Sequence, residues 1–385
     1  MLSRRSSYPR EPNALTLALA ARGGPCDDLT TSNPTAVGLA WDEGELAAAL
    51  GAPGVARYDP APFGAWAARA AVAGYYAAHG AAVDPARVVL SASTSEAYGW
   101  LFKLLCDPGD EALVARPGYP LFDELARLEG VALRGFPLAC EGRWELDVAA
   151  VRAALTARTR AVMLVHPNNP TGSFVSSEAR DALAALCAER GLALVVDEVF
   201  LDWAWRPPAP RSFADESRCL TFTLGGLSKA ALLPQVKLAW TVVSGPAEPR
   251  DEALARLDLI ADGYLSVSAS AQLAAPTILA RSGALVDRAR ARIRANLAAL
   301  RAAVTPTSGV TVLPAEAGWY AVLRAPVTRS EDEWVLALRD DARALVQPGW
   351  FYDFGRGAHL VVSLLPEPAV FAAAIARVIA RIDAD

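Results

Sequence analysis

The sequence predicts an α/β fold in which a mostly parallel sheet is flanked by helices, together with a smaller α+β domain. Three observations predict it. Short apolar, often β-branched runs recur through the middle of the chain, most of them separated by Ala/Leu/Arg/Glu-rich stretches with helical spacing. These runs are apolar on both faces, which is typical of parallel strands covered by helices on both sides. After a long basic-striped helix near residues 285–304, the remaining segments form a second, smaller unit.

In chain order, the first unit has six runs that we expect to be strands, at residues 87–90, 111–115, 161–165, 192–196, 219–223 and 238–243, and a helix at 177–190. In the second unit we expect strands at 310–313, 319–323 and 359–364, and helices near 331–345 and 368–382. A chain of 385 residues is too long for one small core and suits two domains of ordinary size.

Composition narrows the function classes. With 53% hydrophobic and 21% charged residues the chain is expected to be globular, and a net charge of −5 argues against a nucleic-acid partner. No apolar run has the length of a membrane span, and prolines separate the twin arginine near the N-terminus from a short apolar stretch, so we expect a cytoplasmic protein. Five cysteines without a C-x-x-C pair, and only three histidines, predict no disulfide framework and no metal site.

Polar residues follow the predicted strands, where ligands bind in open α/β sheets. Ser93, Thr94 and Ser95 open a helix after the first strand, where hydroxyls and free N–H groups can hold a phosphate or carboxylate. A plain helix cap is the alternative for these residues. Tyr119 stands on a proline-bounded turn after the second strand and could stack on a flat ring, or could simply pack in the core.

Three further groups follow later strands. Asn169 presents an amide on a stiff loop, and Asp197 ends an apolar strand, where a carboxylate is costly to desolvate unless it pairs with a cation. Only three of the 37 lysines and arginines are lysines, and one of them, Lys229, follows a Gly-Gly-Leu-Ser turn. A lysine amine, unlike arginine, can lose its proton and attack a carbonyl. One ligand, pyridoxal phosphate, would use all of these groups: the phosphate-binding hydroxyls, the stacking tyrosine, the amide, the carboxylate and the lysine.

From about Asp28 to its end the chain resembles the fold-type-I pyridoxal-phosphate enzymes of the class I/II aminotransferase family. The resemblance rests on segments that match the family in order and spacing, namely Thr94-Ser-Glu-Ala97, Asp107-Pro-Gly-Asp110, Asn169-Pro-Thr-Gly172, Asp197-Glu198 and Ser228-Lys229. It implies an N-terminal segment (1–45) that packs with the small domain, a large PLP-binding domain (46–280) and a small C-terminal domain (281–385).

The resemblance also implies a role for each site residue. Lys229 would form a Schiff base with pyridoxal 5'-phosphate and move a proton, and Asp197 would pair with the pyridine N–H. Asn169 would hydrogen-bond the ring O3′ and Tyr119 would stack on the ring. The phosphate would be held by Ser93, Thr94, Ser95, Ser228 and Lys237. Tyr58 would reach the phosphate of a partner subunit, which implies a homodimer, and Asn33 would lie where the N-terminal segment closes over the substrate.

Three positions depart from the family pattern. Phe200 stands where a tyrosine usually donates to O3′, and Lys237 stands where an arginine usually binds the phosphate. Val361 replaces the arginine that usually clamps the substrate carboxylate, which puts the substrate class in doubt. A substitute cation is then needed unless the substrate lacks a carboxylate at this point, and Arg356, on a glycine-flanked loop five residues upstream, is the candidate.

The resemblance therefore implies a PLP-dependent aminotransferase of amino-acid metabolism that moves an amino group between an amino acid (or amine) and a 2-oxo acid. A decarboxylase or a C–S/β-eliminating lyase of the same fold is the alternative, which Phe200 favours. A non-catalytic PLP-binding sensor ranks last, because the segment before Asp28 is too short for a DNA-binding domain. A dinucleotide-binding protein is disfavoured, since no G-x-G-x-x-G follows any predicted strand.

Overall fold

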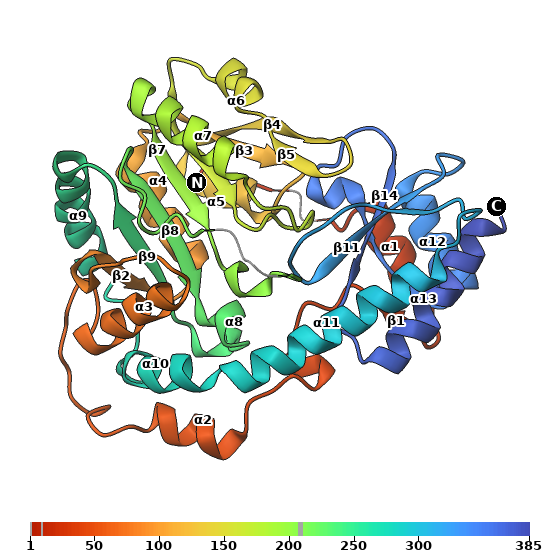
Figure 1. The fold of residues 1–385 in the computed structure, drawn as a ribbon, viewed down its shortest axis with the longest axis horizontal. Coiled ribbons are helices and arrows are strands. Elements are labelled where there is room, and N and C mark those ends of the chain that lie inside the picture. Colours follow the sequence, from red (N-terminus) through yellow and green to blue (C-terminus); the bar gives the residue numbers. More distant parts are fainter. Residues whose placement is uncertain (1, 9–10, 207–210) are drawn as a thin grey trace.

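The computed structural model describes residues 2–8, 11–206 and 211–385, and its largest element is an eight-stranded sheet (Figure 1). The strand order is β2-β9-β8-β7-β6-β3-β4-β5. Neighbouring strands from β8 to β4 are parallel, whereas β9 runs antiparallel to both of its neighbours and β5 antiparallel to β4. The strands span Val88–Ser91 (β2), Glu111–Arg116 (β3), Ala132–Cys140 (β4), Trp144–Leu146 (β5), Thr159–Val165 (β6), Ala193–Asp197 (β7), Thr221–Gly226 (β8) and Ala239–Ser244 (β9).

The mostly parallel sheet confirms the predicted fold class, and each of the six predicted runs overlaps one of its strands. Side chains of alternate residues point to opposite faces, and both faces are covered. Val114 and Phe222 pack with α4, α5 and α9, whereas Leu113 and Leu194 pack with α6 and α7 on the other side. The helices around the sheet are α2 (Glu43–Leu50), α3 (Trp66–Ala78), α4 (Thr94–Leu105), α5 (Leu121–Glu129), α6 (Val148–Ala154), α7 (Ser177–Arg190), α8 (Leu227–Ala230), α9 (Ala247–Asp262) and α10 (Ala269–Arg281).

A second, antiparallel sheet has the order β10-β11-β14-β13, and the long helix α11 leads to it from α10 (Figure 1). Its strands are β10 (Thr311–Val312), β11 (Tyr320–Ala325), β13 (Gln347–Pro348) and β14 (Ala358–Ser363), with helices α11 (Gly283–Ala303), α12 (Glu331–Asp341) and α13 (Pro368–Asp383). Helix α12 ends at Asp341 rather than near residue 345, because Arg343 takes a left-handed φ of 51° and the chain continues as the short strand β12 (Ala344–Leu345).

The N-terminal segment contacts both sheets. After α1 (Ala14–Ala20), strand β1 (Asp27–Asp28) pairs in parallel with β12, and the Leu29 carbonyl accepts a hydrogen bond of 2.6 Å from Ser363 N. Further on, Trp41 Nε1 donates to the Ala231 carbonyl at 2.8 Å, directly after α8. The segment thus runs from the small sheet to the large one.

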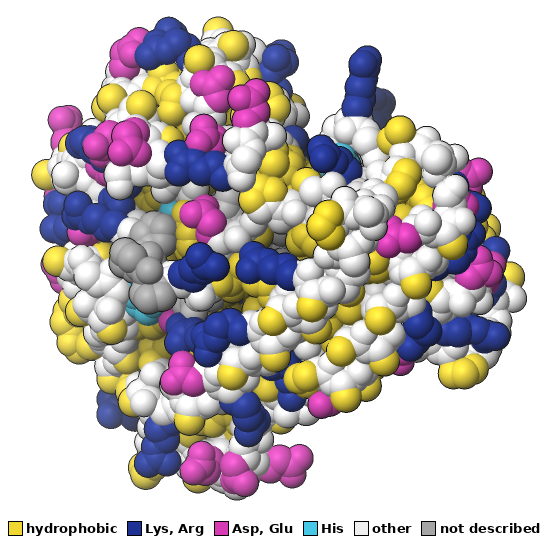
Figure 2. All heavy atoms as spheres, turned by 45° about the vertical axis from the view of Figure 1, so that its right-hand side comes forward, with side chains coloured by type: hydrophobic (Ala, Val, Ile, Leu, Met, Phe, Trp, Pro, Cys, Tyr) yellow, Lys and Arg dark blue, Asp and Glu magenta, His cyan; other side chains and the backbone are white. Residues whose placement is uncertain are grey.

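On the face shown in Figure 2, acidic, basic and hydrophobic side chains are intermixed. Within the described ranges, no helix is long and apolar enough to cross a bilayer.

Candidate active site

The carboxyl ends of neighbouring strands bring together segments that are far apart in the sequence. On β9, Ala239 pairs with Ser91 of β2 on one side and with Gly226 of β8 on the other. Ser93 follows the first strand end, Ser228 follows the second, and Lys237 precedes Ala239, so the three leave the sheet next to one another. The Leu227 N–H donates to the Leu238 carbonyl at 3.0 Å, which holds two of these segments side by side.

Lys229 lies in α8, directly beyond the end of β8. Its Nζ is 4.4 Å from the centroid of the Trp319 ring and 5.6 Å from that of Phe200. The side chain keeps some exposure, but the surrounding protein desolvates its amine and lowers the pKa to about 8, although the nearby Asp197 carboxylate acts in the opposite direction. Roughly a quarter of such amines are uncharged at pH 7.5, against roughly one in a thousand for an unperturbed lysine.

Asp197 is the last residue of β7 and is buried. Its carboxylate accepts hydrogen bonds from the Tyr98 hydroxyl and from Val199 N, both at 3.0 Å. Burial raises the pKa of Asp197 to about 6 despite these two donors and the charge of Lys229. The carboxylate is therefore oriented but short of positive charge, and a cation bound beside it would be stabilised.

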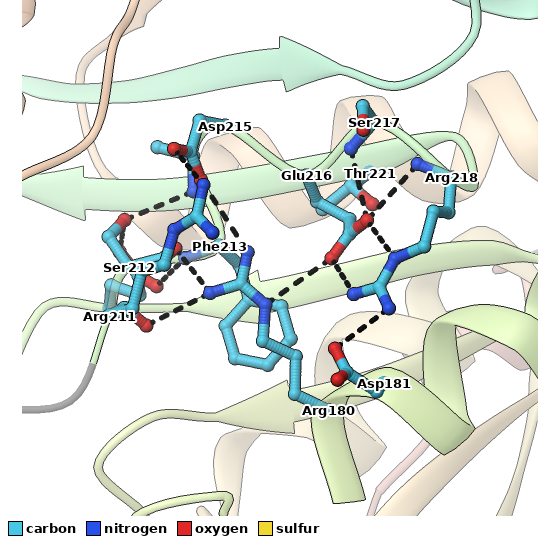
Figure 3. A network of polar contacts seen from close by, with 12 residues as sticks. Arg180, Asp181, Arg211, Ser212, Phe213, Asp215, Glu216, Ser217, Arg218 and Thr221 are labelled. Carbon is cyan, nitrogen blue, oxygen red and sulfur yellow. Dashed lines mark hydrogen bonds and ion pairs between the residues drawn. The ribbon is translucent and has the colours of Figure 1, made fainter. Parts of the chain in front are cut away.

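The neighbouring Glu198 is held by a different set of donors. Its carboxylate accepts from Ser212 Oγ at 2.6 Å and from Phe213 N at 2.7 Å, and burial raises its pKa to about 7. Figure 3 shows how the segment that carries these donors is fixed to α7. Arg180 donates to the Ser212 carbonyl at 2.7 Å, lies 4.5 Å from the Phe213 ring centroid, and pairs with Glu216 at 3.3 Å.

Glu216 in turn is bound by Arg218, and these hydrogen bonds, together with the charges of Arg218 and Arg180, lower the pKa of Glu216 to about 2 although burial opposes the shift. This cluster of compensating charges, in which Arg180 and Glu216 are buried, thus fixes the segment that holds Glu198.

Asn169 is buried, and its Oδ1 has no hydrogen-bond partner in the part of the chain that the structure describes. Its loop is held by the preceding residue, because Asn168 Nδ2 donates to the Pro117 carbonyl at 3.1 Å and to Thr171 Oγ1 at 2.9 Å. A buried amide oxygen without a partner is costly, so Asn169 is a group that a ligand could satisfy.

The N-terminus of α4 offers an anion site. Ser93 caps the helix by accepting from Glu96 N at 3.1 Å, and Glu96 Oε2 accepts from Ala92 N and Ser266 Oγ, both at 2.7 Å. The first-turn N–H groups of Thr94 and Ser95 have no helical acceptor, as at any helix start, and are suited to phosphate oxygens.

Burial, and then the charge of Asp197, raise the pKa of Tyr119. Its ring contacts Phe122 edge-on, with 5.4 Å between the centroids.

Three predicted residues are not brought together with Lys229 within this chain. Tyr58 is 80% exposed and lines an open cavity of about 440 Å³ with Trp66, Trp100 and Leu265. Asn33 is exposed, and its Oδ1 accepts from the Thr35 backbone at 3.1 Å and from the Thr35 hydroxyl at 2.8 Å. Arg356 is exposed on the loop before β14, at the opposite end of that strand from Ser363.

Four further residues of the structure were not predicted from the sequence. Tyr98 orients Asp197 from the middle of α4, and only its place one turn beyond the phosphate-binding residues could have indicated it. Trp319 covers Lys229 from a segment ninety residues later in the chain. Gln347 and Tyr352 belong to short elements, β13 and the 3-10 turn at Gly349–Tyr352, that were not predicted at all.

These groups fit pyridoxal phosphate. The unpartnered Asn169 oxygen, the desolvated Lys229 amine, the Asp197 carboxylate that lacks a full counter-charge and the free N–H groups of α4 match a hydroxyl-bearing, aldehyde-bearing, cationic ring with a phosphate arm.

Comparison with known proteins agrees with a pyridoxal-phosphate site. The sequence pattern of the family "Aminotransferase class I and II" matches residues 26–361. The aspartate aminotransferase of Geobacillus stearothermophilus is 25% identical over 279 residues, covering 69% of each chain. The alanine aminotransferase of Mycobacterium bovis is 28% identical over 305 residues, covering 75% of this chain and 69% of that one.

Solved structures agree as well. A Thermus thermophilus aspartate aminotransferase mutant superposes with a TM-score of 0.84 at 26% identity, over 99% of both chains. The alanine aminotransferase of Pyrococcus furiosus shares the fold, with a TM-score of 0.86 at 21% identity over 96% of both chains. The chain therefore belongs to the class I and II aminotransferase family and is a pyridoxal 5'-phosphate-dependent aminotransferase.

Proposed function

We propose that this aminotransferase carries out its reaction at Lys229, with Asp197, Asn169 and Tyr119 around the cofactor ring and Ser93, Thr94, Ser95, Ser228 and Lys237 around its phosphate. The observation that supports this most strongly is the lowered pKa of the Lys229 amine, about 8, beside the buried Asp197. Both groups come from segments that end neighbouring strands, β7 and β8, whose register pairs Asp197 with Leu224.

Bound there, pyridoxal phosphate supplies an electron sink next to the α-carbon of the amino acid. The protein's part is to hold and move protons. The Lys229 amine has a pKa close enough to neutrality to take a proton from the α-carbon and return it elsewhere. Asp197, fixed by Tyr98 and Val199, would hold a negative charge at the ring nitrogen, and Trp319 and Phe200 cover the amine.

The phosphate is held by neutral donors and one lysine. Lys237 offers a point charge, not the two-pronged contact of an arginine, so more of the binding falls on the hydroxyls and N–H groups at the start of α4. We expect the affinity for the cofactor to depend strongly on Ser93 and Ser228 for this reason.

We further propose that the protein is a homodimer. Tyr58, Trp66 and Tyr264 are 80%, 60% and 50% exposed, and the first two line the open cavity beside Ser266, whose hydroxyl contacts the helix cap at Glu96. Large exposed aromatic groups around a cavity are typical of an interface. In the dimer, Tyr58 would reach the phosphate bound in the other copy.

Two further expectations stay predictions. The division into residues 1–45, 46–280 and 281–385 is supported by the N-terminal contacts with Leu345 and Ser363, and limited proteolysis tests it. The cytoplasmic location is the second of these predictions, and cell fractionation tests it.

The experiment for the site is reduction of the cofactor-loaded protein with borohydride, followed by peptide mapping. We expect the adduct on Lys229 and its disappearance in Lys229→Arg. An adduct on Lys103 or Lys237 would contradict the assignment. The donor that converts the bound cofactor to its amine form, without release of carbon dioxide or ammonia, then identifies the amino substrate and distinguishes transamination from decarboxylation or elimination.

A further inference from the structure

One face of the small sheet is directed toward the large sheet. It carries a hydrogen-bond donor, the amide of Gln347, whose NH₂ group has no acceptor among the described residues. On β14, Val361 is fully buried and pairs directly with Val322 of β11 on one side and with Gln347 of β13 on the other. Directly opposed residues of antiparallel strands share a face, so Gln347 stands beside the position where the family pattern has an arginine.

The same face points toward the large sheet. His359 is two residues from Val361 and so shares its face. The His359 ring stacks on Phe354 with 4.7 Å between the centroids, and Phe354 contacts Trp144 of β5 at 5.9 Å. The side chains of this face therefore lie between the two sheets, as a substrate-binding residue must.

Tyr352 fixes the orientation of Gln347. The Tyr352 hydroxyl donates to Gln347 Oε1, so the oxygen of the amide is occupied and its NH₂ group is left to donate. No acceptor for Gln347 Nε2 occurs among residues 2–8, 11–206 and 211–385, and the residue is partly exposed. The backbone carbonyl of Tyr352 accepts from Gly118 N at 3.0 Å, which ties this pair to the turn that carries Tyr119.

The pair also adjoins the site electrostatically. After burial, the hydroxyls of Tyr320 and Tyr119 raise the pKa of Tyr352, and burial with Tyr119 nearby raises the pKa of Tyr320 to about 12. The charge of Asp197 in turn contributes to the raised pKa of Tyr119. These pKa shifts place Tyr352 and Tyr119 within electrostatic reach of each other, and the hydrogen bond from Gly118 N to the Tyr352 carbonyl is the direct link between their segments.

We propose that Gln347, positioned by Tyr352, is the specificity-determining residue that receives the α-carboxyl group of the amino donor, in place of an arginine. The inference rests on the Lys229 site proposed above. An amide donor holds a carboxylate through neutral hydrogen bonds and holds an amide or ester carbonyl in the same way. This wall of the site therefore discriminates weakly between a charged acid and its uncharged derivatives, whereas an arginine would strongly prefer the acid.

The test uses the cofactor-loaded enzyme and two probes that cannot complete the reaction because they lack an α-hydrogen, 2-methylalanine and 2-methylalaninamide. Calorimetric titration gives the Kd of each. For the wild-type enzyme we expect the two values to agree within roughly tenfold. Gln347→Leu should weaken both by roughly 10- to 100-fold, which is the loss of a hydrogen bond to a charged or strongly polar group.

Gln347→Glu separates recognition from a structural defect. Its carboxylate should repel 2-methylalanine but still accept a hydrogen bond from the amide of the second probe, so the Kd ratio should move in favour of the amide by roughly tenfold or more. Tyr352→Phe, which removes only the orienting bond, should weaken both probes less than Gln347→Leu does.

Arg356→Ala is the rival variant. If it weakens 2-methylalanine while Gln347→Leu does not, or if the Gln347→Glu ratio does not move, or if neither probe binds the wild-type enzyme, the proposal is wrong. Borohydride mapping of the same variants keeps the two questions apart. An adduct that stays on Lys229 while both Kd values are unchanged overturns the role of Gln347 alone, whereas an adduct elsewhere overturns the site itself.

Discussion

Lys229 Nζ lies 4.4 Å from the centre of the Trp319 ring, and Trp319, which directly precedes β11, is fully buried. The amine that we propose does the chemistry belongs to the large-sheet part of the chain, and a side chain from the small-sheet part covers it. The surrounding protein desolvates the amine and lowers the pKa of Lys229 to about 8, against the opposite effect of the Asp197 charge.

Trp319→Ala should admit water to the amine, so the pKa of Lys229 should rise by about one unit or more from about 8 towards its ordinary value. The pH dependence of acetic anhydride labelling of Lys229 in the cofactor-free protein, read by mass spectrometry, measures it. Trp319→Phe keeps an apolar cover and is the matched control, for which we expect a smaller change. An unchanged or lower midpoint in Trp319→Ala would mean that Trp319 does not shield the amine.

Asp197→Asn should preserve the shape of the site and remove the negative charge at the cofactor ring. We expect turnover to fall by orders of magnitude, because the neutral ring is a poor electron sink, while cofactor retention falls far less, because the start of α4 is untouched. Stopped-flow absorbance and equilibrium dialysis measure the two quantities. Near-normal turnover would show that Asp197 is structural.

Tyr98→Phe removes a donor to the Asp197 carboxylate, now 3.0 Å away. Because that bond favours the charged form, the pKa of Asp197 should rise above about 6, and the acidic limb of the rate profile should move to higher pH. A bond to a charged group is worth about 1.5–3 kcal/mol, so a move of about one unit is expected. A pH profile that superposes on that of the wild type would exclude this role.

Glu198→Gln should change how stability depends on pH. The folded pKa of Glu198, about 7, lies above its unfolded value, so between pH 4.5 and 7 the unfolded chain ionises first and the wild type loses stability as pH rises. The variant lacks this loss. The free energy of unfolding of the variant minus that of the wild type should therefore increase over this window by up to about 3 kcal/mol. Urea unfolding at several pH values measures it, and a flat difference would contradict it.

Trp66→Asp should place a charge in the proposed dimer interface and shift the protein to monomers in sedimentation velocity, with a loss of cofactor affinity because Tyr58 of the other copy is withdrawn. Val327→Asp is the control, since Val327 is 76% exposed on a turn of the small unit, and it should change neither property. A wild-type protein that sediments as a monomer would refute the homodimer.

Strand β7 could be predicted from the sequence, whereas strand β13 could not. The apolar run that ends at Asp197 could be predicted because a buried parallel strand imposes a composition on every position, and the ligand groups follow such strands. By contrast, β13 has only two residues, Gln347 and Pro348, too few for any periodicity. The turn that follows β13 sets its place beside Val361. The packing of the two sheets sets the contact of Trp319 with Lys229. Local sequence encodes neither of these.

The close approach at Gly172 has a consequence for how this enzyme can vary. A Cβ at this position would lie 2.2 Å from the Ala317 carbonyl oxygen, and the Gly172 carbonyl accepts from Glu316 N at 3.1 Å. The loop that carries Asn169 and the segment that leads into Trp319 thus share a backbone seam with no room for a side chain. Any side chain at position 172 would push the two segments apart and so move the Trp319 indole away from the Lys229 amine. Substitutions at position 172 should therefore change the pKa of Lys229, although Gly172 itself is not among the proposed site residues.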